Sequence, residues 1–382
     1  MRKLHFIDSY STKELHELFN SSSLMMFSKL YDRVEYYASK TSSLNTKKII
    51  QPFPTTISIH NIPVIPYEPG YKALLKQLLA TIVNIYLLIK IPKRDVVLFN
   101  YNTILSLKPI NFINRYLKKK VIIICHGELE SLSKPLDQTF GGRKLKSFFL
   151  NSNLNLSNDI YFFVLGESIK KNVIRLVDKQ FTNRFYSFEH TAIFKNRMLK
   201  KYKDSECLNV AFLGSMRDNK GIDQILKLVQ RFENNIKIKF TIIGRIRTDI
   251  SIINKLGINY INGADKFFLS RKLMDNEMEN QDIILFMYPT DSYKFTASGA
   301  LLDAIGYEKP ILSLPNDYFN YVMNKRISTG KILNNDDEIY AYLNFLINNP
   351  LPTYNFQEIK SALSPISEAK NLIKTLRSIK LL

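Results

Sequence analysis

The residues best suited to bind an anion lie in the second half of the chain, between an apolar run and a helix-forming segment. Thr296, Ser298 and Gly299 follow the apolar run 282–287 and lead into the segment 300–306. Free backbone N–H groups at the start of such a helix, together with its dipole, attract anions. The hydroxyl groups and the glycine would let a phosphate approach the backbone closely. An ordinary turn with a serine cap explains the same pattern equally well.

Two further loops follow predicted strands in the same half. One begins with Gly214 and Ser215 and carries the cations Arg217 and Lys220, and the other begins at Gly244. Because the carboxyl ends of parallel strands meet at one edge of a sheet, we expect these loops and the helix start to converge on one crevice. Arginine offers a fork for phosphate oxygens and lysine a point charge, which together suit a diphosphate. The P-loop and the common dinucleotide-binding motif are absent.

The predicted helix contributes its own polar group. Asp303 lies about one helical turn after Ala300, where its carboxylate would accept hydrogen bonds from the hydroxyls of a ribose. The predicted donor site therefore comprises Gly214, Ser215, Arg217, Lys220, Gly244, Thr296, Ser298, Gly299, Ala300 and Asp303.

The first half also carries polar residues after apolar runs. Asp8 follows the predicted strand 3–7, and a polar segment, 11–23, is expected to link it to a helix over 24–38. We expect an acceptor site here, with a solvated loop as the alternative. Its candidates are Asp8, His16, Asn20 and Ser21. Further polar side chains follow two later strands, and these are His126, Glu128 and His190.

Strands and helices alternate along most of the chain, which predicts an α/β fold with doubly wound parallel sheets. We expect a Rossmann-like acceptor-binding domain over 1–194, a basic linker over 195–206 and a nucleotide-sugar-binding domain over 207–355. The remaining segment, 356–382, is expected to form a helix that packs back on the first domain.

The segment 71–91 is the most apolar helix candidate. Lys76 and several polar neighbours make it a poor transmembrane helix, because such a helix wants about 20 apolar residues nearly free of charge. A buried crossover helix is the favoured interpretation. A helix lying against a bilayer, with Lys90, Lys93 and Arg94 beside it, is the alternative.

The chain is strongly basic, and the charge is uneven. Of 382 residues, 54 are Lys or Arg and 34 are Asp or Glu, a net charge of +20. The segment 1–204 holds 32 basic against 15 acidic residues, or +17, which leaves +3 for the rest. This predicts an anionic partner for the first half, either a membrane surface or a phosphorylated substrate. Sequence signatures of zinc fingers, RNA-binding RNP motifs and bZIP proteins are absent, which argues against nucleic acid.

Other bulk features place the chain in a reducing compartment. It has two cysteines and 45% apolar residues, which indicates packed cores without a disulfide framework. Its N-terminus shows no signal-peptide pattern. We therefore expect a cytoplasmic protein that associates peripherally with the inner face of a membrane.

Two motifs and the two-domain layout resemble a known family. A predicted strand ends at Leu213-Gly214, its loop closes with Lys220-Gly221-Ile222-Asp223, and the segment 303–310 has the sequence DAIGYEKP. This combination resembles GT-B glycosyltransferases, most closely glycosyltransferase family 4 and its relatives. In that family the lysine and a nearby arginine hold the donor diphosphate, and the acid of the second motif holds the ribose. His126-Gly127 resembles the His-Gly pair of the family's acceptor domain.

The chain departs from the family pattern at two positions. Ser215 stands where the family usually has arginine, so Arg217 would have to substitute for it or the role would be shared. Thr296 stands where the first of two paired acids would be, which removes a usual contact to the donor sugar, while Asp303 replaces the second acid conservatively. The segment SGALLDAI resembles the corresponding segment in a divergent branch of these enzymes that is often tied to surface polysaccharide assembly.

The resemblance implies transfer of a sugar from a nucleoside-diphosphate sugar to a glycan or lipid-linked acceptor, with no further cofactor. The chain has no Asp-x-Asp motif, so we expect diphosphate binding without a metal ion. His126 and Glu128 are the candidate catalytic residues, with structural roles as the alternative for both. Two other functions stay open: a nucleotide-sugar 2-epimerase of the same fold, and a non-catalytic basic protein that binds membranes or nucleic acid.

Overall fold

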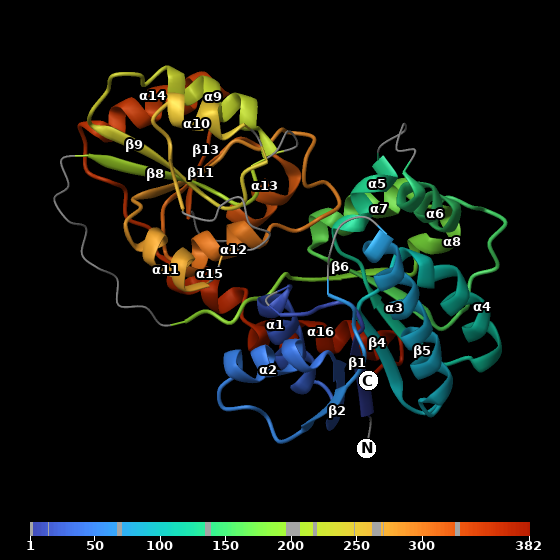
Figure 1. The fold of residues 1–382 in the computed structure, drawn as a ribbon. Helices are drawn as coiled ribbons and strands as arrows, with labels where there is room; N and C mark the ends of the chain where they lie inside the picture. Colours follow the sequence, from blue (N-terminus) through green and yellow to red (C-terminus); the bar gives the residue numbers. More distant parts are fainter. Residues whose placement is uncertain are drawn as a thin grey trace. The chain divides into compact units, whose positions relative to one another are not determined.

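The chain forms two compact units (Figure 1). The structure, a computed structural model, describes residues 3–13, 15–66, 71–133, 139–195, 207–216, 220–247, 249–261, 269, 271–324 and 329–382. Unit 1 comprises Met1–Ile193, Phe295–Ala297 and Ser361–Leu382, and unit 2 comprises Phe194–Lys294 and Ser298–Lys360. The predicted linker, 195–206, lies outside the described residues except for its first residue.

Unit 1 is built on a parallel sheet of seven strands in the described residues, in the order β3-β2-β1-β4-β5-β6-β7. The strands are β1 (Lys3–Asp8), β2 (Arg33–Ala38), β3 (Ile57–Asn61), β4 (Val96–Tyr101), β5 (Lys120–Ile124), β6 (Ile160–Leu165) and β7 (Phe185–Phe188). The central strands are apolar on both faces and fully buried, as expected where helices cover both sides of a sheet.

The helices of unit 1 alternate with these strands. They are α1 (Glu17–Ser28), α2 (Lys40–Ile49), α3 (Tyr71–Lys90), η1 (Ile104–Ser106), α4 (Leu107–Leu117), η2 (Gly127–Leu129), α5 (Glu130–Ser133), α6 (Phe140–Phe149), α7 (Glu167–Leu176), α8 (Lys179–Thr182) and, from the C-terminus, α16 (Pro365–Ser378). The last helix packs against α1 and β7, so the chain returns to unit 1 after completing unit 2.

Unit 2 repeats the plan with six described strands in the order β10-β9-β8-β11-β12-β13, all parallel. The strands are β8 (Leu208–Leu213), β9 (Ile238–Ile243), β10 (Asn259–Tyr260), β11 (Ile283–Phe286), β12 (Ile311–Ser313) and β13 (Gly330–Ile332). Its helices are α9 (Ile222–Gln230), α10 (Ile250–Lys255), α11 (Arg271–Glu279), α12 (Gly299–Gly306), α13 (Asp317–Met323), α14 (Asp336–Ile347) and α15 (Phe356–Ala362). The predicted α/β class with two doubly wound parallel sheets is confirmed.

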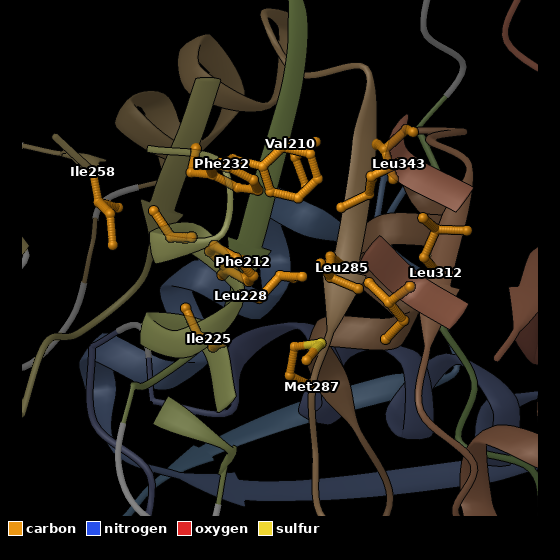
Figure 2. Packing of buried hydrophobic residues seen from close by; sticks show 14 of the residues in the cluster. Val210, Phe212, Ile225, Leu228, Phe232, Ile258, Leu285, Met287, Leu312 and Leu343 are labelled. Carbon is orange, nitrogen blue, oxygen red and sulfur yellow. The ribbon is translucent and has the colours of Figure 1, made fainter. Parts of the chain in front are cut away.

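The core of unit 2 lies between the sheet and its helices. Figure 2 shows Phe212 of β8 and Leu285 of β11 among side chains from α9, including Ile225 and Leu228. These residues are at most 1% exposed, so each contributes most of its transfer free energy, about 1.5–3 kcal/mol. The packed sheet gives the loops at its carboxyl edge a rigid base.

The expected helix over 24–38 is wrong. Helix α1 begins earlier, at Glu17, and ends at Ser28, and the strand β2 occupies Arg33–Ala38. The serines 21–23 suggested a polar linker, but they lie buried inside α1. Ser22 forms a hydrogen bond of 2.5 Å with Thr191, and Ser21 donates to the carbonyl oxygen of Glu17 at 2.7 Å. Small hydroxyl side chains can be buried at little cost when they find such partners.

Candidate functional site

The strand order of unit 2 reverses between β8 and β11, and a crevice is expected at such a switch point. Gly214, directly after β8, has φ +113°, and a Cβ on it would lie 3.7 Å from the Cβ of Ala300 at the start of α12. A Cβ on Gly244, directly after β9, would lie 1.9 Å from the carbonyl oxygen of Gly214. The structure therefore brings together three segments that are far apart in the sequence.

Lys220 lies beside two stacked tyrosines at this edge. The rings of Tyr288 and Tyr293 stack with centroids 4.9 Å apart, and the Lys220 Nζ lies 4.6 Å and 4.8 Å from the two centroids. Its ammonium donates to both tyrosine hydroxyls, at 3.4 Å for Tyr288. Tyr288 is itself fixed, because its hydroxyl donates to the Leu213 carbonyl oxygen at 3.1 Å. The tyrosines hold the cation in place through cation–π and hydrogen-bond contacts.

Sequence analysis missed both tyrosines. Tyr288 and Tyr293 precede Thr296, Ser298 and Gly299, which were the residues expected to bind the anion here. The signal that could have found them is the position of Tyr288 directly after a buried strand, at the edge where ligands gather.

The two serines of the predicted donor site differ in their surroundings. Ser298 is buried and caps α12, since its hydroxyl accepts a hydrogen bond of 3.3 Å from the Leu301 N–H. The serine-cap interpretation is thus correct for its side chain, while the remaining first N–H groups of the helix still face its N-terminal end. The Ser215 Oγ is buried and has no hydrogen-bond partner within the described residues. A buried hydroxyl without a partner suggests a position where a ligand would complete its bonding.

Asp303 is engaged by a residue that sequence analysis did not identify. The Arg271 Nη1, at the start of α11, donates to the Asp303 carboxylate at 2.8 Å. The two residues are 32 positions apart and lie on different helices, so no sequence pattern predicts their contact. Only the fold brings them together. The pair places a cation and an anion close together on α11 and α12.

Two predicted donor residues are placed differently from the rest. Arg217 lies outside the described residues. Thr296 belongs to the short segment Phe295–Ala297, which clusters with unit 1 instead of unit 2. Gly299 opens α12 as predicted, and a Cβ on it would meet no atom within 4 Å.

A chain of hydrogen bonds joins the strand ends of unit 1. The Asp8 carboxylate accepts from the Ser11 N–H at 2.9 Å and from the Asn20 side chain at 2.6 Å. The Asn100 side chain donates to the Asn20 side-chain oxygen at 2.8 Å, and His126 Nε2–H donates to the Asn100 carbonyl oxygen at 2.7 Å. The predicted residues Asp8, Asn20 and His126 therefore share one network through Asn100.

Aromatic contacts complete this group. Phe19 lies between His126 and His190, with ring centroids 4.7 Å and 5.2 Å away. His16 lies 5.6 Å from His126, centroid to centroid, and its backbone adopts the left-handed conformation at φ 57°. Ser21, the last candidate of this half, only bonds within its own helix. Two of the histidines thus flank Phe19, and His16 lies beside one of them, a grouping that periodicity could not reveal.

Burial sets the protonation of this group. Burial lowers the pKa of His126 to about 4, against the opposing effect of its hydrogen bond to the Asn100 carbonyl, so the ring is neutral at pH 7. With Nε2 protonated toward Asn100, Nδ1 carries the lone pair. Burial also raises the pKa of Glu128 to about 7, although its carboxylate accepts the His126 N–H at 2.9 Å. The carboxyl of Glu128 therefore changes charge near neutral pH.

Acidic and thiol groups are dispersed in the part of the chain that the structure describes. No group of three or more His, Cys, Asp or Glu side chains there is arranged to hold a metal ion. Cys125 and Cys207 are both free thiols.

Comparison with known structures identifies the architecture. HepE from Anabaena, solved with UDP, superposes with a TM-score of 0.59 at 10% identity over 99% of this chain and 100% of its own. The lipopolysaccharide outer core galactosyltransferase WaaB gives 0.58 at 11% identity, covering 98% and 99%. Arabidopsis thaliana UGT89C1, solved with quercetin, gives 0.54 at 10% identity, covering 100% and 99%. The chain has the GT-B fold.

Sequence comparison adds nothing to this assignment. No protein-family model matches the chain, and no curated protein matches it by sequence. The GT-B fold explains why two βα units follow each other here and why the C-terminal helix returns to unit 1. The assignment to glycosyltransferase family 4 stays a prediction.

Proposed function

We propose that this GT-B protein is a glycosyltransferase that takes a sugar from a nucleoside-diphosphate sugar. The observation that carries the proposal is the Lys220 ammonium, held by two tyrosines at the switch point of unit 2 beside the Gly214 loop. The buried Ser215 hydroxyl without a partner in the described residues supports it. So does the fold, because the similar HepE was solved with UDP, and with UDP and glucose.

The proposed chemistry follows from charge. Cleavage of the sugar–phosphate bond leaves negative charge on the departing nucleoside diphosphate. Lys220 and the N-terminal end of α12 stabilise that charge, and they are already oriented before the reaction. The Arg271–Asp303 pair offers a cation and an acceptor for the hydroxyls of a ribose.

We assign the acceptor side to the Asp8–His126 network of unit 1. Its neutral His126 Nδ1 accepts a proton or a hydroxyl hydrogen, and Glu128 is poised to exchange a proton near neutral pH. A glycan or lipid-linked acceptor of polysaccharide assembly is our proposal for the acceptor substrate, in line with the similar WaaB, a lipopolysaccharide outer core galactosyltransferase.

Replacing Lys220 tests the donor site. We expect Lys220→Met to weaken nucleotide-sugar binding by roughly ten- to a hundredfold, because a charge-assisted contact contributes about 1.5–3 kcal/mol. The measurement is calorimetric titration with UDP, GDP, ADP and CMP sugars, preceded by a thermal-shift screen, since a ligand that binds the folded state raises Tm.

The matched control is Lys227→Met, an exposed lysine in the last turn of α9 of the same unit. It should bind the ligand as the wild type does. If Lys220→Met keeps full affinity, or if no sugar nucleotide binds to the wild type, the donor site is not where we place it.

A further inference from the structure

Helix α3 of unit 1 has an unusual distribution of side chains. Its buried face combines the apolar Ala80, Val83, Leu87 and Leu88 with the polar Lys76 and Asn84. Apart from Lys90 at its end, its exposed face is apolar or aromatic, and the exposed members are Tyr71, Leu74, Leu75, Leu78, Ile82, Tyr86 and Ile89. An ordinary surface helix places its apolar stripe toward the core and its polar residues toward water. In α3 large apolar side chains cover the outer face as well.

Polar contacts on the inner face fix the orientation of α3. The Asn84 side chain donates to the Asn102 side-chain oxygen at 3.2 Å, and Thr81 forms a hydrogen bond of 3.1 Å with Thr103. The buried Lys119 ammonium donates to the carbonyl oxygens of Leu88, at 2.5 Å, Ile89, at 2.9 Å, and Ile91 at the end of the helix. Rotating the apolar face inward would break these bonds, so the helix presents it to the outside.

The neighbouring helix α4 extends the apolar surface. Helices α3 and α4 pack against each other, and both run along the same side of unit 1 in Figure 1. Helix α4 contributes Phe112, 57% exposed, and Tyr116, 70% exposed, whose rings pack edge to face at 5.5 Å. Aromatic rings at the boundary of an apolar surface are typical of proteins that sit in the headgroup region of a bilayer.

The charge around this surface has one sign. The segment 71–120 contains ten Lys or Arg residues and a single acid, Asp95, which is buried and bonded to His5. The exposed basic residues of this segment are Lys90, Lys93, Arg94, Lys108, Arg115 and Lys118. The two helices and their connection thus carry exposed cations and no exposed acid, which complements an anionic lipid surface. Each basic residue near the headgroups strengthens binding about fivefold.

We propose that the α3–α4 face, defined by the exposed apolar residues of α3 with Phe112 and Tyr116, docks on an anionic lipid bilayer. The apolar side chains enter the headgroup boundary and the surrounding cations contact lipid phosphates. This proposal goes beyond the proposed transfer reaction and does not depend on it. A second copy of this chain is a poorer occupant, because the cations of two such faces would oppose each other.

The buried polar residues of α3 argue against its crossing the membrane. By length and mean hydropathy α3 is long and apolar enough to cross a bilayer, and it alone passes that test within the described residues. However, about a third of its most apolar window is buried inside unit 1, including Lys76 and Asn84. Crossing would pull these polar groups away from Asn102 and Asp8 into hydrocarbon, where they would lack partners. Docking keeps every inner contact.

Flotation of the full chain with lipid vesicles tests the proposal. We expect binding to phosphatidylcholine vesicles that contain phosphatidylglycerol, little binding to phosphatidylcholine alone, and a sharp loss as salt rises. The double variant Ile82→Ser/Tyr86→Ser should bind at least roughly tenfold more weakly, since it removes two large exposed groups. The triple variant Lys90→Gln/Lys93→Gln/Arg94→Gln should also lose binding, by about fivefold for each charge.

Matched controls lie in unit 2. Ile236→Ser removes an isoleucine that is even more exposed than Ile82, and Lys227→Gln removes an exposed lysine. Both variants should float as the wild type does. All replaced side chains are exposed, so Tm should not change. Equal flotation of the wild type and the α3 variants would overturn the proposal.

Two other results would also overturn it. If the wild type forms dimers in the absence of lipid and Ile82→Ser/Tyr86→Ser makes it monomeric, the face binds a second copy of the chain. Resistance of the bound protein to alkaline carbonate would assign α3 to a transmembrane position. Binding of UDP, measured in parallel, reports on the donor site alone, so failure of docking and failure of the proposed function are distinguishable.

Discussion

At the residue scale, the environment of a side chain decides its chemistry more than its type does. Lys220 and Lys76 both lie near tyrosine rings, yet the surroundings of their ammonium groups differ. Lys220 lies at a strand edge beside two stacked tyrosine rings, where we propose that its charge meets a ligand. Lys76 is buried beside Asp8 and Tyr10, and burial lowers its pKa to about 8. One serves a proposed anion site, and the other supports the inner face of a helix.

Glu128 gives a prediction at this scale. Burial raises its pKa from 4.5 to about 7, so the folded state binds its proton more tightly than the unfolded chain does. Its contribution to stability is therefore complete below pH 4.5 and is lost as the pH rises through about 7. Between pH 5 and 8 we expect the free energy of unfolding of the wild type to fall by roughly 2–3 kcal/mol relative to Glu128→Gln.

Denaturant unfolding of both proteins across this pH range measures the effect. The comparison cancels the histidines, which both proteins share. A difference that stays constant with pH would mean that the carboxyl titrates in its ordinary range and that Glu128 is not poised for proton transfer near pH 7.

At the element scale, α3 shows how a few polar groups can orient a helix that has apolar residues on most of its surface. Its apolar residues occur almost all round, so periodicity favours burial, and the sequence predicted a buried crossover helix first. The structure instead buries Lys76, Thr81 and Asn84 in part or in full and exposes the apolar stripe. Polar partners just before η1 and just before β5 decide this orientation, because each inner hydrogen bond would otherwise be lost.

Lys119 provides the test at this scale. Its ammonium satisfies three carbonyl oxygens at and just beyond the end of α3, which have no following helical turn to bond. We expect Lys119→Met to lower the free energy of unfolding by about 1–3 kcal/mol, because buried carbonyls would lose their donor. Lys118→Met is the control, since Lys118 is exposed and carries its charge in water. Chemical denaturation compares the two, and equal stabilities would show that Lys119 does not anchor α3.

At the scale of the whole molecule, two parallel-sheet units divide the work that we propose. The described cations of the donor site lie in unit 2, while most of the net charge lies in the half of the sequence that forms unit 1. This distribution separates a local charge at Lys220 from the broad positive surface of α3 and α4. We propose that Lys220 binds a small anion, the diphosphate, and that the α3–α4 face binds an extended one, the lipid surface.

Chelation of metal ions gives the prediction at this scale. Because the chain has no Asp-x-Asp motif and offers Lys220 and the start of α12 to the diphosphate, we expect transfer to continue in EDTA at close to its full rate. The assay is release of nucleoside diphosphate from the donor found in the thermal-shift screen, with and without EDTA. Loss of activity that manganese or magnesium restores would contradict the prediction and would direct attention to Asp291, Asp303 and Asp317 as ligands.

The sequence alone determined the fold class, because unbroken apolar strands such as 121–124 and 160–165 alternate with helical patterns, and parallel sheets covered by helices bury both faces of such strands. It also located Lys220, Gly214 and the start of α12, since a glycine after a buried strand is a local signal. The tertiary structure decided which partners these residues have. Arg271 meets Asp303, and Tyr293 meets Lys220, across separations that no local pattern encodes.

The same holds for the serines of α1 and for α3. Local composition predicted a polar linker and a buried apolar helix, yet the serines are buried and the apolar stripe is exposed. Burial depends on whether distant residues such as Thr191 and Asn102 supply hydrogen-bond partners. Hydrophobicity is a property of the residue, but the satisfaction of a polar group is a property of the fold.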